Sequence, residues 1–146
     1  MNPRQLSKHF IRAEFECACG CGFDTVDAEL ITAIEDAHSH FHGKYKTKTR
    51  IIITGGNRCI AHNEVVQQRY NPNYVPFSSK SFHIMAKAAD FRVEVRDKKS
   101  GKWARVPADQ VADYLEDKYP DCYGIGRYRG VTHLDVRDGK ARWDKR

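Results

Sequence analysis

The sequence predicts a small α+β domain, with an antiparallel sheet and helices packed on it. Three observations lead to this prediction. Apolar residues recur at helical spacing between residues 27 and 43. A β-branched run at residues 50–54, closed by two glycines, is typical of a buried strand. Strand and turn patterns dominate the later part of the chain, which favours α+β architecture over a doubly wound parallel sheet.

Length and composition limit the classes of protein to which the chain can belong. Its 146 residues predict one domain, residues 1–146, with a hydrophobic core of its own. With 40% hydrophobic and 30% charged residues, a disordered chain and a coiled coil are excluded. No apolar run approaches the roughly 18 residues needed to cross a bilayer, so we expect no membrane insertion. The net charge of +6 indicates an anionic partner.

The first half of the chain is expected to hold two helices and one strand. Residues 1–26 show no sustained periodicity and are predicted as an irregular N-terminal segment that belongs to the domain. A helix is expected from Asp27, a suitable N-cap, to Gly43, which is expected to end it. The strand at residues 50–54 is followed by a short helix at residues 62–69.

The second half of the chain is expected to supply most of the sheet. Residues 71–82, with two prolines and three serines, predict a long loop. Strands are expected at residues 88–96, 103–106, 123–127 and 131–137. Pro107 suits the first position of a helix that reaches Tyr119. The pair Asp138-Gly139 predicts a hairpin that leads into residues 141–143.

Two histidines and one aspartate are candidate metal ligands. His83 and Asp90 lie seven positions apart, where a tight turn would join a loop to a strand. His133 and Asp135 alternate along a predicted strand, so both side chains point to the same face of the sheet. Two histidines and a carboxylate are a common catalytic zinc set, which leaves a fourth position for water. On the residues alone, histidines without a metal and a hydrogen-bonded His133–Asp135 pair stay open as alternatives.

Several short motifs occur in an order that resembles one family. They are Thr54-Gly55-Gly56-Asn57-Arg58-Cys59, Ser81-x-His83-x6-Asp90, Gly124-x-Gly126-x-Tyr128 and His133-x-Asp135, preceded by Leu6-Ser7-Lys8-His9-Phe10. In this order they are similar to the zinc D-Ala-D-Ala carboxypeptidases and endopeptidases of the hedgehog/D,D-peptidase fold. The compact, endolysin-like peptidoglycan peptidases of bacteriophages are the members that the chain resembles in particular. The resemblance covers about residues 6–143.

The resemblance implies a role for each of five residues. His83, Asp90 and His133 are implied as the ligands of one catalytic Zn²⁺. Arg58 is implied as a catalytic residue that binds a substrate carboxylate or carbonyl oxygen, for which its planar guanidinium is suited. Ser81, two residues before the first ligand, is expected to bind substrate or to orient the loop. A hydroxyl that only stabilises a turn is the alternative for Ser81.

The general base does not transfer from the family. Many relatives place an aspartate or glutamate three residues before the last histidine ligand, where this chain has Gly130. We predict Asp135 as the catalytic base, because it shares a strand face with His133, and Asp121 and the unassigned histidines are weaker choices. If no base is present, the chain would be a zinc-dependent wall-binding domain with weak or no catalytic activity.

The resemblance predicts a zinc metallopeptidase that hydrolyses stem peptides or cross-links of bacterial peptidoglycan during phage-induced lysis. Either a D,D-carboxypeptidase or an endopeptidase fits, and cleavage of the L-Ala-D-Glu bond stays open. We expect a monomer that binds no nucleic acid, because the basic runs lack interleaved aromatic residues. The N-terminus lacks an apolar signal peptide, so we expect synthesis in the host cytoplasm and action at the cell wall or periplasm after holin-type release.

The cysteines are not explained by this resemblance. There are five, Cys17, Cys19, Cys21, Cys59 and Cys122, and reduced thiols are expected in the absence of a signal peptide. The first three alternate, unlike the Cys-x2-Cys spacing of a structural zinc knuckle. Packed or free thiols are the preferred interpretation, and an auxiliary zinc site is the alternative.

Overall fold

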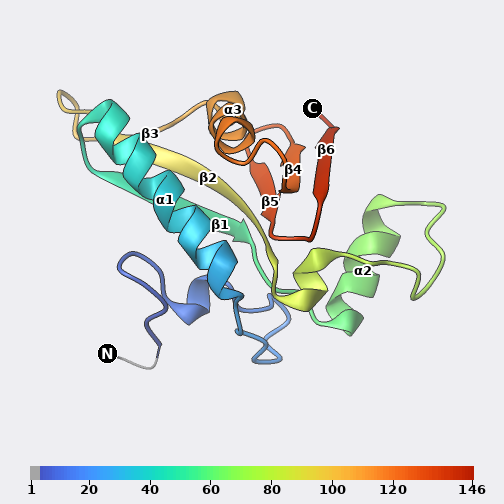
Figure 1. Cartoon of the computed structure of the whole chain (residues 1–146). Coiled ribbons are helices and arrows are strands. Elements are labelled where there is room, and N and C mark those ends of the chain that lie inside the picture. Colours follow the sequence, from blue (N-terminus) through green and yellow to red (C-terminus); the bar gives the residue numbers. More distant parts are fainter. Residues whose placement is uncertain (1–3) are drawn as a thin grey trace.

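One mixed sheet of six strands organises the chain, and the α+β class is confirmed (Figure 1). The computed structural model describes residues 4–146, so residues 1–3 of the predicted N-terminal segment lie outside the described residues. The strands are β1 Thr49–Gly55, β2 Ala88–Arg96, β3 Trp103–Arg105, β4 Tyr123–Arg127, β5 Thr132–Asp135 and β6 Lys140–Asp144. The helices are α1 Ala28–Tyr45, α2 Ile60–Tyr70 and α3 Ala108–Lys118, with two 3₁₀ turns at Arg12–Glu14 and Phe82–Met85.

Helix α1 begins as predicted and ends later. The Asp27 side chain accepts a hydrogen bond from the backbone N–H of Glu29, as an N-cap does. Gly43 does not end the helix, which continues to Tyr45 and is closed by Lys46 in the left-handed conformation, with φ 53°. The extra residues are held because the Tyr45 ring packs against the core and its hydroxyl lies 2.8 Å from Gln110 Oε1 of α3.

Helices α2 and α3 differ from prediction at their ends. Helix α2 starts at Ile60 rather than residue 62, because the Cys59 side chain accepts a hydrogen bond from the His62 backbone N–H and caps the first turn. Pro107 is the N-cap of α3 and not its first helical residue, since its ψ of 131° is extended.

The sheet is not purely antiparallel, which corrects the sequence prediction. In the order β1-β2-β5-β4-β6, strand β5 already pairs with β2 on one edge and with β4 on the other. The turn at Asp138-Gly139 therefore cannot form the predicted hairpin with β5. Instead β6 crosses to the free edge of β4, where it runs parallel to that strand. Strand β3 pairs with the far end of β2, beyond the part of β2 that pairs with β5.

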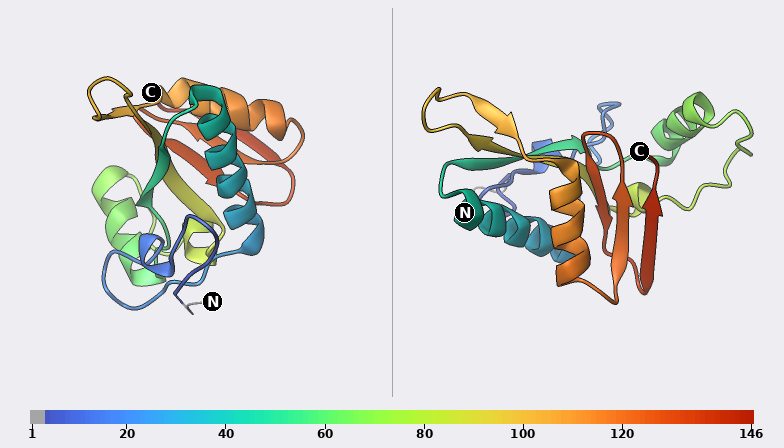
Figure 2. Two further views of the ribbon diagram at one scale, coloured as in Figure 1. Left: turned by 90° about the vertical axis from the view of Figure 1, so that its left-hand side faces the viewer. Right: turned by 90° about the horizontal axis from the view of Figure 1, so that it is seen from above.

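Helices α1 and α3 cover one face of the sheet, while α2 and the loop after it project beyond the end of β1 (Figures 1 and 2). Between these helices and the strands lies the hydrophobic core, whose largest fully buried side chains include Phe10, Phe15, Phe41, Phe91, Leu30, Ile34, Leu115, Ile125 and Leu134. Across residues 4–146, none of the helices combines the length and apolar character required to span a membrane. The opposite face of β2, β5, β4 and β6 is left for polar side chains.

Candidate active site

The candidate ligands lie in a row across the face of the sheet opposite α1 and α3. Asp90 of β2 pairs in register with His133 of β5, which pairs with Gly126 of β4, which in turn pairs with Trp143 of β6. Residues directly opposite each other on neighbouring strands share a face, so these four form one row. Their strand neighbours turn the other way and belong to the core: Ala89, Phe91, Ile125 and Leu134. The fifth participant, His83, reaches the row from the 3₁₀ turn just before β2.

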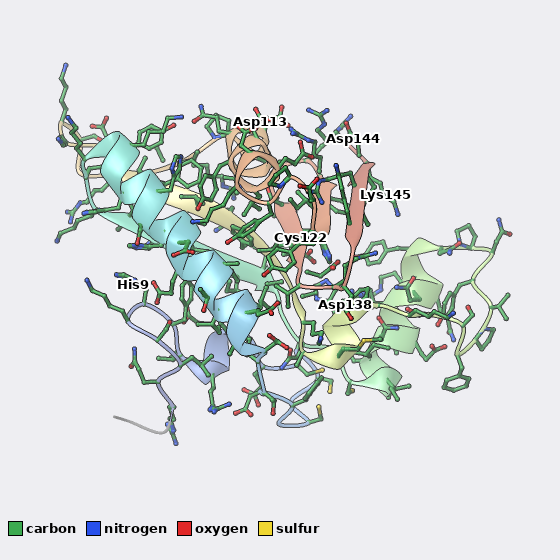
Figure 3. All side chains as sticks on the ribbon, in the orientation of Figure 1. His9, Asp113, Cys122, Asp138, Asp144 and Lys145 are labelled. Atoms are coloured by element: carbon green, nitrogen blue, oxygen red, sulfur yellow. The ribbon has the colours of Figure 1, made fainter. Side chains whose placement is uncertain are left out.

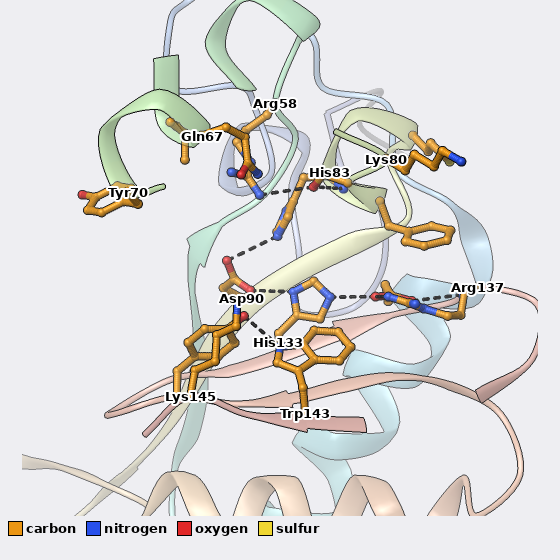
Figure 4. A pocket seen from close by; sticks show the side chains of 16 residues that line it. Arg58, Gln67, Tyr70, Lys80, His83, Asp90, His133, Arg137, Trp143 and Lys145 are labelled. Carbon is orange, nitrogen blue, oxygen red and sulfur yellow. Dashed lines mark hydrogen bonds and ion pairs between the residues drawn. The ribbon is translucent and has the colours of Figure 1, made fainter. Parts of the chain in front are cut away.

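Three electron-pair donors converge at this row (Figure 4). His83 Nε2 lies 3.3 Å from Asp90 Oδ2, and His133 Nδ1 lies 2.9 Å from Asp90 Oδ1. One donor atom from each of the three residues lies within 4.8 Å of the other two. The fold therefore brings the three residues that were predicted as metal ligands close together.

The second nitrogen of each imidazole identifies which nitrogen is available to a metal. His83 Nδ1 lies 2.7 Å from the carbonyl oxygen of Gly56, which can only accept, so Nδ1 carries the proton and Nε2 the lone pair. His133 Nε2 lies 2.7 Å from Asp135 Oδ2, which assigns the proton to Nε2 and leaves the lone pair on Nδ1, the nitrogen that faces Asp90. The lone pairs of both imidazoles therefore face the Asp90 carboxylate at short range. Because lone pairs and a carboxylate repel each other, a cation bound between them would stabilise this arrangement. The donor set therefore fits a zinc ion.

Burial and charge oppose each other in the pKa values of this cluster. Burial raises the pKa of Asp90, but the neighbouring imidazoles of His133 and His83 outweigh it and hold the pKa well below its ordinary value. For His133, burial lowers the pKa. The carboxylates of Asp135 and Asp90 raise it by more, so that the pKa lies above its ordinary value. The carboxylates are thus kept ionised, as metal ligands and their partners need to be.

Asp135 is placed behind His133 rather than beside the converging donors. It is completely buried, at 0% exposure, and its two oxygens accept hydrogen bonds from Arg137 Nε and Arg137 Nη2, each at 2.7 Å. One of these oxygens also accepts from His133. Burial raises the pKa of Asp135, but Arg137 and His133 lower it to well below its ordinary value. This geometry favours the hydrogen-bonded His133–Asp135 pair over the predicted role of Asp135 as a general base.

Arg58 and Ser81 are connected to the first histidine. The backbone N–H of Arg58 donates to the carbonyl oxygen of His83 at 3.1 Å, and Arg58 Nη2 donates to Ser81 Oγ at 3.3 Å. Ser81 Oγ also accepts the backbone N–H of His83 at 3.3 Å and so caps the turn that carries this ligand. Burial lowers the pKa of the Arg58 guanidinium, which still carries its charge at neutral pH. Ser81 therefore orients the loop, while Arg58 faces the pocket.

A pocket of about 860 Å³ opens over these residues. Besides Arg58, Ser81, His83, Asp90, His133 and Asp135, its lining includes Tyr70, Lys80, Tyr128, Arg137, Trp143 and Lys145. Its size is in the range of ordinary ligand sites. Asp121, a weaker choice for a base, is exposed and does not line this pocket.

A family model described as Peptidase M15 matches residues 8–135, which includes every predicted site residue. The chain belongs to the Peptidase M15 family. No curated protein and no solved structure shows significant similarity to it. Family membership makes the chain a peptidase, in agreement with the resemblance found in its sequence.

Arg137 and Trp143 line the pocket of this M15 peptidase and were not among the site residues predicted from its sequence. Arg137 holds Asp135, and its guanidinium stacks 4.5 Å from the centre of the Phe82 ring and 5.4 Å from that of Trp143. Trp143 donates its indole N–H to the Tyr128 hydroxyl at 2.8 Å. The alternation Asp135-x-Arg137 within the chain could have indicated the first of these.

The Gly-x-Gly motif of the M15 peptidase is explained by the side chains that lie over β4. A Cβ atom at Gly124 would overlap the carboxylate of Asp135, and one at Gly126 would overlap the indole of Trp143. Both glycines sit on the site face, two residues apart. The motif therefore provides room for the Asp135 carboxylate and the Trp143 indole, a function that neither periodicity nor composition revealed.

Proposed function

We propose that this M15 peptidase is a zinc enzyme that hydrolyses peptide bonds in the stem peptides or cross-links of bacterial peptidoglycan. The observation that carries the proposal is the convergence of His83 Nε2, His133 Nδ1 and the Asp90 carboxylate within 4.8 Å, with the protons of both imidazoles directed away. These three residues would hold the ion. When bound, zinc supplies Lewis acidity that polarises a carbonyl group and activates water at neutral pH.

The residues around the ion have separate tasks in this proposal. Asp135 fixes the ring orientation of His133 and raises its basicity, as carboxylates behind zinc-bound histidines do. Arg58 binds a carboxylate or carbonyl oxygen of the substrate through its planar guanidinium. The ion pair with the half-buried Arg137 holds Asp135 in place from behind.

The pocket lining supports an anionic peptide as substrate. Arg58, Lys80 and Lys145 bring three cationic side chains to it, besides Arg137, whose charge is paired with Asp135. Peptidoglycan stem peptides carry free carboxylates, so the charges are complementary. A monomeric enzyme that reaches the wall during phage-induced lysis is the context that we propose, as either a D,D-carboxypeptidase or an endopeptidase.

Digestion of purified peptidoglycan tests the proposal. We expect new amino groups from the wild-type protein, and mass spectrometry of the released muropeptides identifies the bond that is cut. His83→Ala should lose one equivalent of zinc and at least a thousandfold in rate, whereas His40→Ala, an exposed histidine on α1, should retain both. Full activity in His83→Ala, or in protein stripped of zinc, would overturn the proposal.

A second candidate function is wall binding without hydrolysis. It is favoured by the fact that the carboxylates lining the pocket, Asp90 and Asp135, both have their oxygens engaged by neighbouring side chains. Retention on peptidoglycan without release of amino groups would support this candidate instead.

A further inference from the structure

Four of the five cysteines come together at one place in the fold, although the sequence spaced one of them far from the others. Cys17, Cys19 and Cys21 lie in the loop before α1, and Cys59 caps the start of α2. Each Sγ atom lies within 4.8 Å of the other three. Cys122 is labelled in Figure 3 and lies by β4, well away from this loop. The first four define the cysteine cluster.

The sulfur separations match metal ligation better than a covalent bond. The Sγ atoms of Cys17 and Cys19 are 3.4 Å apart, and those of Cys19 and Cys59 are 3.7 Å apart. A disulfide bond would bring two of them to about 2.05 Å. Four sulfurs at about 2.3 Å from a tetrahedral zinc ion would lie about 3.8 Å from one another. The cluster therefore has close to the dimensions of a tetrathiolate site.

Backbone geometry around the cluster also suits thiolate ligands. The Cys59 backbone N–H points at Cys17 Sγ and the His62 N–H points at Cys59 Sγ, both at 3.4 Å. Such N–H groups stabilise the negative charge of coordinated sulfur. Gly20 and Gly22, which follow the second and third cysteines, have φ of +80° and +87°. These turns, which glycine adopts without strain, direct three alternating side chains to one point.

We propose that Cys17, Cys19, Cys21 and Cys59 bind one structural zinc ion, separate from the His83–Asp90–His133 site. Each thiol would release its proton to solvent when it binds the metal. Four protein ligands leave no open position for water, which is the arrangement of a structural and not a catalytic zinc ion. Iron can occupy the same ligand set, so the metal has to be identified in the experiment.

The site would fasten the N-terminal segment to the residue that precedes α2. Arg58 is adjacent to Cys59, and its other neighbour, Asn57, donates through Nδ2 to the carbonyl oxygen of Thr25 at 2.6 Å. The Asn57 backbone N–H donates to Phe15 O at 2.8 Å. A metal in the cluster would therefore stabilise the backbone that carries Arg58 into the pocket.

Counting metal in matched variants tests the proposal without reference to activity. Protein purified under reducing conditions should contain two zinc ions per chain, measured by elemental analysis together with iron. Cys59→Ser and Cys21→Ser should each contain one, and so should His83→Ala. Cys122→Ser is the matched control, because it removes a cysteine outside the cluster, and it should contain two. The count of zinc at the cysteines is independent of whether the peptidase proposal holds.

A measurement on the wild-type chain covers the case in which a cysteine variant does not fold. A thiol reagent should react promptly with Cys122 alone, and chelation of the metal should make the four cysteines of the cluster reactive as well. Replacement of zinc by cobalt(II) should give the sulfur-to-cobalt charge-transfer absorption of a tetrathiolate site. A zinc content that Cys59→Ser and Cys21→Ser leave unchanged, a disulfide among the four cysteines in mass spectra of unreduced peptides, or one iron ion at the cysteines in place of zinc would each overturn the assignment.

Discussion

At the scale of single residues, the hydrogen-bond partners behind each candidate ligand fix its orientation and its tautomer. His133 faces Asp90 with one ring nitrogen and Asp135 with the other, at 2.9 and 2.7 Å. The second contact fixes the ring tautomer, and Arg137 fixes the carboxylate that makes it. The site is thus held by a chain of charge-assisted hydrogen bonds rather than by the ligands alone.

Asp135→Asn tests the role of the residue behind His133. The amide retains the shape but loses the charge, so we expect the zinc affinity of the site to fall about 10–100-fold and kcat to fall with it. Competition with a chelator measures the affinity, and circular dichroism checks that the chain is folded. Asp138→Asn, in the exposed turn before β6, is the control. Unchanged zinc affinity with lost activity would instead favour Asp135 as the base.

Glu35 predicts a pH-dependent part of the stability. It accepts hydrogen bonds from the backbone N–H of His9 at 2.8 Å and from the Ser7 hydroxyl, and its carboxylate lies 2.6 Å from His9 Nδ1. Burial raises the pKa of Glu35, but these hydrogen bonds outweigh it and hold the pKa below its ordinary value. The stabilisation is therefore fully present above the unfolded-state pKa of about 4.3 and disappears as pH falls through the lower folded-state pKa.

Glu35→Gln should reduce the free energy of unfolding by about 1–2 kcal/mol at pH 7. Denaturant unfolding at a series of pH values measures the difference from wild type, which should shrink toward zero in acid. Asp36→Asn removes the half-buried carboxylate at the adjacent position, which lies 3.4 Å from Lys118 Nζ in a solvent-accessible ion pair, and should change the stability by less than about 1 kcal/mol. A difference for Glu35→Gln that stays constant with pH would contradict the prediction.

At the scale of elements, two glycines in the same sequence have opposite functions. Gly126 on β4 leaves space for the Trp143 indole of the site. Gly43 lies within α1, and a Cβ atom there would meet no atom within 4 Å. The first glycine is required by packing across the sheet, whereas the second costs helix stability and has no packing function in return.

Alanine at each position should therefore change the stability in opposite directions. Gly126→Ala should destabilise the fold by about 1–3 kcal/mol because Trp143 is displaced, and it should lower activity. Gly43→Ala should stabilise it by about 0.5–1 kcal/mol, since an interior helical glycine is replaced. Thermal and denaturant unfolding of both variants measure this. Destabilisation by Gly43→Ala would indicate that the helix ends at Gly43 after all.

At the scale of the whole molecule, the net charge of +6 is concentrated in part around the pocket. Lys80 precedes the turn that carries His83, and Lys145 follows β6, so the two exposed amines come from opposite ends of the second half of the chain. Both line the pocket together with Arg58 and Arg137. The tertiary fold thus brings basic side chains that are far apart in the sequence to the rim of one pocket.

The double variant Lys80→Gln/Lys145→Gln should raise KM for peptidoglycan fragments several-fold at low salt, with a smaller effect on kcat. The difference should fade as salt is raised, because the screening length falls from about 10 Å at 0.1 M to about 3 Å at 1 M. Lys98→Gln/Lys99→Gln changes the charge equally, in the exposed turn between β2 and β3, and serves as the control. Equal effects of the two double variants would show that only net charge matters.

The sequence by itself determined the α+β class, most strands and helices, and the ligand candidates. Helical and strand periodicities are local, so Asp27 could be identified as a cap and β2 could be placed at residues 88–96 without tertiary information. The set His83, Asp90 and His133 came from motif order, and the fold brings it together. The roles of these residues, and zinc itself, stay predictions for the experiments above.

Only the tertiary structure decided which segments meet. Both edges of β5 are occupied, so β6 lies parallel to β4, and this register places Trp143 opposite Gly126. Cys59 joins three cysteines about forty positions earlier because α2 begins against the N-terminal segment, which no local spacing could indicate. The physical reason is the same in both cases. Local patterns reflect the backbone of one segment, whereas strand order and ligand clusters depend on contacts between segments distant in the chain.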